Sequence, residues 1–161
     1  MRYLTPYILK DLSKKMVFIA GPRQCGKTTL AKTFLKDFGT GRYFNWDFDE
    51  DRKDLLQLKW SDKDRLLVID ELHKYGRWKN WIKGVYDKFH EQHRFLVTGS
   101  ARLDTYRKGG DSLLGRYHLW HLHPFCLAEH PGKIPPKEAL QRLMTVGGFP
   151  EPFVDGDVGE A

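Results

Sequence analysis

Residues 21–28 read Gly-Pro-Arg-Gln-Cys-Gly-Lys-Thr, the pattern G-x-x-x-x-G-K-T of a phosphate-binding loop. This pattern is specific only when a buried strand enters the loop and a helix leaves it. The apolar run at 16–20 predicts the strand, and apolar residues at helical spacing over 27–38 predict the helix. The sequence around the loop therefore predicts an α/β fold with a nucleotide triphosphate site.

The residue types of this loop fit phosphate chemistry. Gly21 and Gly26 let the backbone turn tightly and bring its N–H groups close to phosphate oxygens. We expect Lys27 to reach the β- and γ-phosphates and the Thr28 hydroxyl to bind Mg²⁺. Cys25 is expected to be a small filler residue. The predicted nucleotide-binding residues are Gly21, Pro22, Arg23, Gln24, Cys25, Gly26, Lys27, Thr28 and Thr29.

Short apolar runs alternate with helical patterns, which favours a three-layer α/β sandwich around a mainly parallel, five-stranded sheet. The predicted strands are 16–20, 42–46, 65–70, 94–98 and 116–121. The predicted helices are 4–12, 27–38, 50–58, 78–91, 101–107 and 136–146. We interpret the aromatic stripe of the helix at 78–91 as core packing. Residues 1–146 are predicted to form the nucleotide-binding domain, and 147–161 to be a loop.

Composition narrows the classes of function. Apolar residues make up 40% of the 161 residues, enough for one folded domain with a core. Cys25 and Cys126 form no disulfide or metal-binding pattern, and no apolar stretch is long enough for a membrane span, so we expect a cytoplasmic protein. The net charge of +6 makes nucleic acid an alternative partner, but the basic residues are interleaved with acids rather than clustered.

A second signal follows the predicted strand at 65–70, where four apolar residues precede Asp70 and Glu71. In an open parallel sheet, ligands bind beyond the carboxyl ends of the strands. Asp70 is therefore predicted to hold Mg²⁺ through water, opposite Thr28. Glu71 is predicted to orient and deprotonate the attacking water.

Ser100 and Arg116 are further candidates. Ser100 or Thr98, at the end of the strand at 94–98, could sense the γ-phosphate or bind the lytic water; the alternative is that Ser100 caps a helix. Arg116, expected near the nucleotide edge of the sheet, could stabilise the leaving phosphate in cis or from a neighbouring subunit of a homo-oligomer. The alternative for Arg116 is an ordinary surface arginine.

Six motifs occur in order along the chain. They are Gly-Pro-Arg-Gln-x-Gly-Lys-Thr-Thr-Leu (21–30), Asp-Glu-Leu-His-Lys-Tyr (70–75), Thr-Gly-Ser-Ala-Arg-Leu-Asp (98–104), Leu-Leu-Gly-Arg-Tyr (113–117), His-Pro-Phe-x-Leu-Ala-Glu (123–129) and Gly-Gly-Phe-Pro-Glu (147–151). Together they resemble the prokaryotic AAA-like P-loop ATPases whose N-terminal nucleotide-binding domain precedes a C-terminal domain of unknown function. The resemblance implies an extended-AAA sheet, with the strand at 94–98 between the loop strand and the Asp70 strand. It also implies ATP, ADP and Mg²⁺ as ligands, Glu71 as base, Ser100 as sensor and Arg116 as a finger-like arginine. The resemblance further implies that the loop at 147–161 is a linker toward a C-terminal domain absent from this chain.

The leading prediction is a Mg²⁺-dependent ATPase module that converts nucleotide state into a conformational signal. One alternative is a nucleic-acid motor, because Asp-Glu-Leu-His at 70–73 matches the helicase motif D-E-x-H; however, Lys27 and Asp70 are only 43 positions apart. A second alternative is a small-molecule kinase in which residues 102–116 form a lid. The non-enzymatic alternative is an ATP-dependent interaction module with little turnover.

Overall fold

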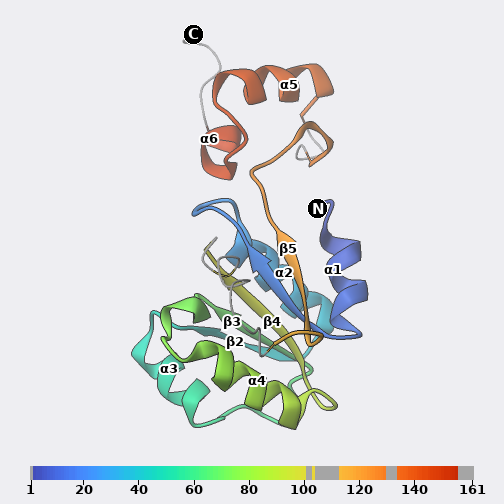
Figure 1. The fold of residues 1–161 in the computed structure, drawn as a ribbon. Helices are drawn as coiled ribbons and strands as arrows, with labels where there is room; N and C mark the ends of the chain where they lie inside the picture. The colour runs from blue at the N-terminus through green and yellow to red at the C-terminus, as the bar shows by residue number, and fades with distance from the viewer. Residues whose placement is uncertain (1, 101–102, 104–112, 130–133, 156–161) are drawn as a thin grey trace.

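A single parallel sheet forms the centre of the molecule. The computed structural model describes residues 2–100, 103, 113–129 and 134–155. The strands are β1 (Met16–Ala20), β2 (Gly41–Asn45), β3 (Leu66–Asp70), β4 (Arg94–Gly99) and β5 (Tyr117–His121). Their order is β2-β3-β4-β1-β5, and every pairing is parallel (Figure 1). The predicted five-stranded α/β fold is confirmed, including the place of β4 between β1 and β3.

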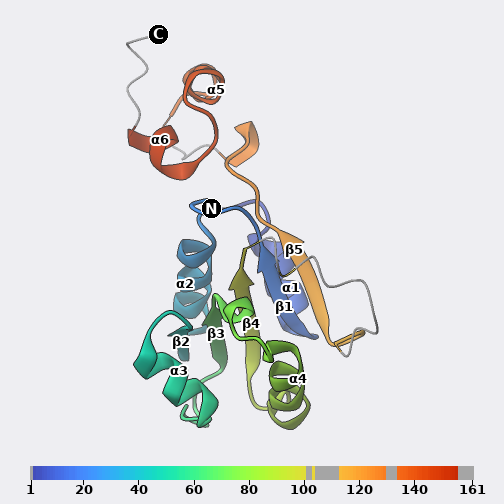
Figure 2. The same cartoon turned by 60° about the vertical axis from the view of Figure 1, so that its left-hand side comes forward.

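Helices cover both faces of this sheet, which gives three layers (Figure 2). On one face lie α1 (Thr5–Leu12) and α2 (Lys27–Phe38), and on the other α3 (Asp49–Leu56) and α4 (Trp78–Phe89). The longest of them, α2 and α4, have 12 residues each. Among the described residues, no helix has the length and apolar content that crossing a bilayer requires.

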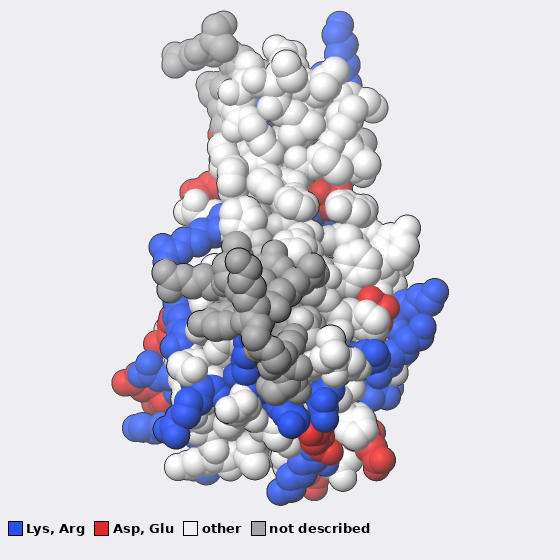
Figure 3. Space-filling view, viewed as in Figure 1, with Lys and Arg blue, Asp and Glu red and all other residues white. Residues whose placement is uncertain are grey.

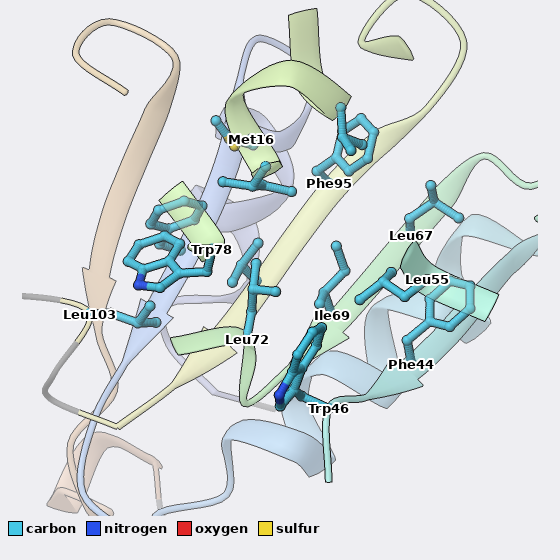
Figure 4. Close-up of a cluster of buried hydrophobic side chains, with 14 of the residues drawn as sticks. Met16, Phe44, Trp46, Leu55, Leu67, Ile69, Leu72, Trp78, Phe95 and Leu103 are labelled. Atoms are coloured by element: carbon cyan, nitrogen blue, oxygen red, sulfur yellow. The ribbon is translucent and has the colours of Figure 1, made fainter. Parts of the chain in front are cut away.

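The central strands are apolar throughout because both of their faces are covered. In β1, Met16 and Phe18 face the α4 side, whereas Val17 and Ile19 face the α1 and α2 side, and all four are buried. Such unbroken apolar runs are typical of parallel strands buried between two helical layers. Figure 4 shows the cluster on the α4 side, in which side chains from α3, α4 and four strands interlock.

The aromatic stripe of α4 belongs to this core, as predicted. Trp78 is 4% exposed, and its ring centroid lies 5.8 Å from that of Phe18. Phe18 in turn stacks on Tyr117 of β5 at 4.6 Å. The stripe therefore fixes α4 against β1 and β5 and is not available for stacking nucleic-acid bases.

The prediction of a loop from residue 147 onward is wrong for part of that segment. After α5 (Pro136–Thr145), the chain forms a second helix, α6 (Pro150–Asp155). Pro150 opens α6, where a missing N–H is tolerated. Phe153 is fully buried, 5.7 Å from the Phe125 ring, and Arg142 donates to the Phe153 carbonyl at 3.1 Å. These distant contacts outweigh the local glycine and proline signals.

Two predicted segments extend beyond the described residues. The predicted helix at 101–107 overlaps the described part of the chain only at Leu103. Residues 156–161 of the predicted linker also lie outside it. The domain boundary at residue 146 stays a prediction.

Charged side chains are unevenly distributed over the face in Figure 3. The end built by α5 and α6 carries few of them, and Leu140 and Met144 of α5 are 49% and 80% exposed. Around the α/β layers, Lys and Arg are interleaved with Asp and Glu. Among the described residues of this face, the basic side chains do not form a continuous patch of the kind expected for nucleic-acid binding.

Candidate nucleotide-binding site

The predicted phosphate-binding loop lies at the carboxyl edge of the sheet, between the end of β1 and the start of α2. Because all strands are parallel, Asp70 of β3 and Gly99 of β4 end at the same edge. A cavity of about 830 Å³ opens there. Its walls include six of the predicted binding residues: Arg23, Gln24, Gly26, Lys27, Thr28 and Thr29.

The loop holds Lys27 in its curve. The Lys27 ammonium donates to the carbonyls of Gly21 and Pro22 at 3.1 and 2.6 Å, and the residue is only 7% exposed. Gly26 has φ of +93°, a left-handed conformation that favours glycine. The Cys25 side chain packs in the core on the α1 and α2 side, and this burial raises the pKa of its thiol. Cys25 is therefore the filler residue that the sequence predicts.

The carboxylate of Asp70 is the centre of a hydroxyl cluster. Thr28 and Tyr43 each donate to Asp70 Oδ2 at 2.7 Å, and Thr98 donates to Asp70 Oδ1. Asp70 is 2% exposed. Burial, followed by the hydrogen bond to Asp70, raises the pKa of Tyr43 far above its ordinary value, which keeps this phenol a donor. The predicted pair Thr28 and Asp70 is thus in direct contact.

These residues fit Mg²⁺. Magnesium prefers oxygen ligands and is usually bound by one or two carboxylates together with substrate phosphates and waters. Thr28 and Asp70 supply a hydroxyl and a carboxylate at the wall of the 830 Å³ cavity. The described part of the chain has no cluster of three His, Cys, Asp or Glu that would form an all-protein cage.

Glu71 follows β3 in a strained conformation. Its φ is +60°, uncommon for a residue other than glycine, and such outliers concentrate at functional sites. The Glu71 N–H donates to the Thr98 carbonyl at 3.0 Å, which fixes the backbone. Glu71 Oε2 lies 3.4 Å from the Lys74 ammonium and 3.7 Å from His73 Nε2. Its side chain is 26% exposed and lines the cavity.

The structure separates the two hydroxyl candidates of β4. Thr98 is fully buried and donates to the Asp70 carboxylate, so its hydroxyl is already occupied by Asp70. Ser100 lies one position beyond the strand, with its hydroxyl 3.1 Å from His73 Nε2. Ser100 is therefore the better candidate for sensing, and His73 connects it to Glu71.

A second cavity, of about 340 Å³, lies on the other side of the loop. It shares Gly26, Thr29 and Pro150 with the first cavity, and Leu30 and Phe125 give it apolar walls. Thr5 also lines it, and the Thr5 hydroxyl is buried with no hydrogen-bond partner among the described residues. The sequence did not reveal this cavity. One sequence signal that could have pointed to it is the motif at 123–129, to which no role is assigned from the sequence.

Arg2 fastens the loop to the segment after β5. The Arg2 guanidinium forms an ion pair with the buried carboxylate of Glu129 at 2.9 Å and lies 4.7 Å from the centre of the Phe125 ring. It also donates to the carbonyls of Cys25 and His123. The N-terminal residues, the loop and residues 123–129 therefore form one contact network.

Comparison with known proteins agrees with this geometry. A family model described as an AAA domain matches residues 13–130. The chain belongs to the AAA domain family. It is also 29% identical over 140 residues to the uncharacterized proteins Mb2031c of Mycobacterium bovis and Rv2008c of Mycobacterium tuberculosis. These matches cover 86% of this chain but 30% of each relative, so this chain spans less than a third of their length.

Solved structures show the same fold. The Thermotoga maritima RuvB Holliday junction branch migration motor matches the AAA domain with a TM-score of 0.51 and 19% identity, covering 78% of this chain and 46% of RuvB. A katanin structure matches with a TM-score of 0.51 and 15% identity, covering 90% of this chain and 51% of that one. At these identities, the likeness concerns the fold alone.

In the structure, Arg116 lies far from the phosphate-binding loop at 21–28. Arg116 precedes β5, and its carbonyl accepts from the N–H of Met16 at the start of β1. The phosphate loop follows the other end of β1, about 16 Å away along a five-residue strand. Arg116 is paired with Asp87 of α4 at 2.7 Å, which lowers the pKa of Asp87. The expected position near the nucleotide edge is therefore wrong, and a role in cis does not fit; a role in trans stays a prediction.

Gly99→Ala should destabilise the AAA domain. A Cβ on Gly99 would lie 2.6 Å from His73 Nδ1 and 3.0 Å from Leu103 Cδ1, so His73 would have to move. We expect a loss of about 1–3 kcal/mol of unfolding free energy, typical of overpacking, measured by chemical denaturation. The control is Gly84→Ala in α4, where a Cβ meets nothing within 4 Å and alanine favours the helix. Equal stability of the two variants would contradict the close packing of Gly99 on His73.

Proposed function

We propose that this AAA domain binds ATP with Mg²⁺, hydrolyses it and acts as a nucleotide-driven switch or motor module in the cytoplasm. The contact between the Thr28 hydroxyl and the Asp70 carboxylate, at 2.7 Å beside the phosphate cavity, supports this most directly. In P-loop proteins, a hydroxyl of the loop and an acid at the end of a neighbouring strand hold the metal that bridges the phosphates.

Each residue has a role in this proposal. Backbone N–H groups of 21–28 and the N-terminus of α2 bind the phosphates, and Lys27 turns from the loop carbonyls to phosphate oxygens. When bound, Mg²⁺ neutralises charge that develops on the transferred phosphoryl group. Glu71 accepts a proton from the attacking water, and Ser100 contacts the γ-phosphate. ADP and phosphate are the products.

We assign the nucleobase to the 340 Å³ cavity. It adjoins the loop through Gly26 and Thr29, and its apolar walls suit a planar aromatic ring. The buried Thr5 hydroxyl offers a hydrogen bond to a ring nitrogen or exocyclic group of the base. This pocket supports a nucleotide ligand rather than inorganic phosphate.

We further propose that Arg116 acts in trans within a homo-oligomer. In this molecule it is at the wrong end of the sheet for its own site, but its side chain is one-third exposed and can reach a neighbour after leaving Asp87. An arginine supplied by another subunit raises phosphoryl-transfer rates by about 10³–10⁵-fold. The activity of an isolated domain at low concentration would accordingly be small.

The role of Arg116 in trans is tested by measuring phosphate release from Mg²⁺-ATP at a series of protein concentrations. The rate per molecule should rise with concentration for the wild type and stay low at all concentrations for Arg116→Ala. Asp87→Ala is the matched control, because it breaks the same ion pair and keeps the arginine. If both variants lose the rise equally, the ion pair is structural and the role in trans is rejected. Absence of any ATP binding by the wild type would overturn the function itself.

A further inference from the structure

One of the three hydroxyl donors to Asp70 comes from outside the predicted site. Thr28 belongs to the phosphate loop, and Thr98 belongs to β4 beside Asp70. The third, Tyr43, is on the edge strand β2, 27 positions before Asp70. No motif that resembles a nucleotide site includes it, and its hydroxyl still lies 2.7 Å from Asp70 Oδ2.

The donors differ in what they do to the carboxylate. An ionised carboxylate has about four lone-pair positions, two on each oxygen. Thr28 and Tyr43 occupy both positions on Oδ2, and Thr98 occupies one on Oδ1. One position on Oδ1 is left for a water of the metal shell. Because rotation of an aspartate carboxylate about its last bond is only weakly restricted, the direction of that position depends on these hydrogen bonds.

Tyr43 is itself held firmly. Its backbone pairs with Val68 in the neighbouring strand β3, and its ring lies against the core on the α1 and α2 side. The ammonium of Lys32, from α2, lies 4.9 Å from the ring centre. The phenol thus reaches Asp70 from strand β2, whereas Thr28 reaches it from the first turn of α2.

We propose that Tyr43 is a positioning residue for magnesium: it fixes the Asp70 carboxylate so that the remaining lone pair faces the hydrated ion. This rests on the proposed function, since it concerns the metal that accompanies ATP. Tyr43 also lines the 830 Å³ cavity, but the role proposed for it acts through its hydrogen bond to Asp70. Its contribution is therefore to the dependence of ATP binding on Mg²⁺ rather than to ATP binding in general.

Tyr43→Phe tests the assignment, because it removes one hydroxyl and keeps the ring. ATP affinity is measured by calorimetry in excess Mg²⁺ and again in EDTA. We expect affinity in Mg²⁺ to fall about tenfold to 100-fold, the usual cost of one hydrogen bond to a charged group, while affinity in EDTA is unchanged. The matched control is Tyr75→Phe. The Tyr75 ring stacks on Trp46 at 4.7 Å near the same sheet edge, and this variant should bind ATP as the wild type does.

Each outcome decides the assignment. Equal losses in Mg²⁺ and in EDTA would mean that Tyr43 only shapes the cavity, and the assignment falls. Unchanged affinity in both conditions, with a wild type that does bind more tightly in Mg²⁺, also overturns it and leaves the proposed function intact. A wild type that binds no ATP, or binds it equally with and without Mg²⁺, removes the metal role of Asp70 and this assignment with it. Thermal unfolding of both variants verifies that they are folded.

Discussion

Lys27→Ala should reduce the affinity for ATP by more than about 100-fold. The substitution removes charge-assisted hydrogen bonds to two phosphates, and each such hydrogen bond contributes about 1.5–3 kcal/mol. The ammonium is already enclosed by the loop, bonded to the Gly21 and Pro22 carbonyls, so it needs little reorganisation to meet phosphate oxygens. Calorimetry with Mg²⁺-ATP measures the loss.

Lys32→Ala is the matched control for Lys27→Ala. Lys32 is on the same helix and lines the same cavity, so this variant removes an equal charge without touching the loop. We expect a small change in affinity for Lys32→Ala. Similar losses for the two variants would show that ATP is held by the general positive charge of the cavity, and the phosphate-loop role of Lys27 would fail.

Glu71→Gln should keep ATP binding and lower the rate of phosphate release by about 10²–10⁴-fold, the usual contribution of a general base. The amide has nearly the same shape, but it cannot take a proton from water. The strained backbone of Glu71 should survive the change, because it is held by the hydrogen bond to Thr98 rather than by the side chain. Single-turnover phosphate release, together with ATP affinity, separates chemistry from binding.

Glu151→Gln provides the control for Glu71→Gln. Glu151 lines the same cavity from α6 and is exposed, so its loss changes the local charge equally. We expect near-normal turnover for Glu151→Gln. A Glu71→Gln variant that releases phosphate at the wild-type rate would refute the base assignment and favour a purely electrostatic role.

The sequence predicts the sheet and the loop well because both depend on local signals. Four apolar residues before Asp70 predict a strand buried on both faces, and β3 occupies that place. The spacing of Gly21, Gly26 and Lys27 defines a loop whose shape is a property of the backbone. Thr28 and Asp70 meet because parallel strands share a carboxyl edge, which the sequence pattern also implies.

The features that the sequence does not predict are those that depend on strand order and on contacts between residues far apart in the chain. Tyr43 reaches Asp70 only because β2 pairs with β3, and nothing in β2 itself marks this tyrosine. Arg116 is predicted near the nucleotide edge of the sheet, but it precedes β5 and pairs with the start of β1, so it lies at the opposite edge. The helix α6 follows glycine and proline signals typical of a loop, and it exists because Phe153 is buried against Phe125.

The network around Arg2 has a consequence for the order in which the molecule can be assembled. The motif at 21–28 is short, but Arg2 ties the Cys25 carbonyl to residues that follow about a hundred positions later, including His123, 121 positions from Arg2. Contacts of such sequence separation form late, because closing long loops costs entropy before any contact repays it. A nascent chain that has emerged only as far as α2 thus contains every residue of the phosphate-binding loop. It still lacks His123 and Glu129, the residues through which Arg2 holds that loop. Competence to bind nucleotide should therefore arrive only after residue 129 has left the ribosome.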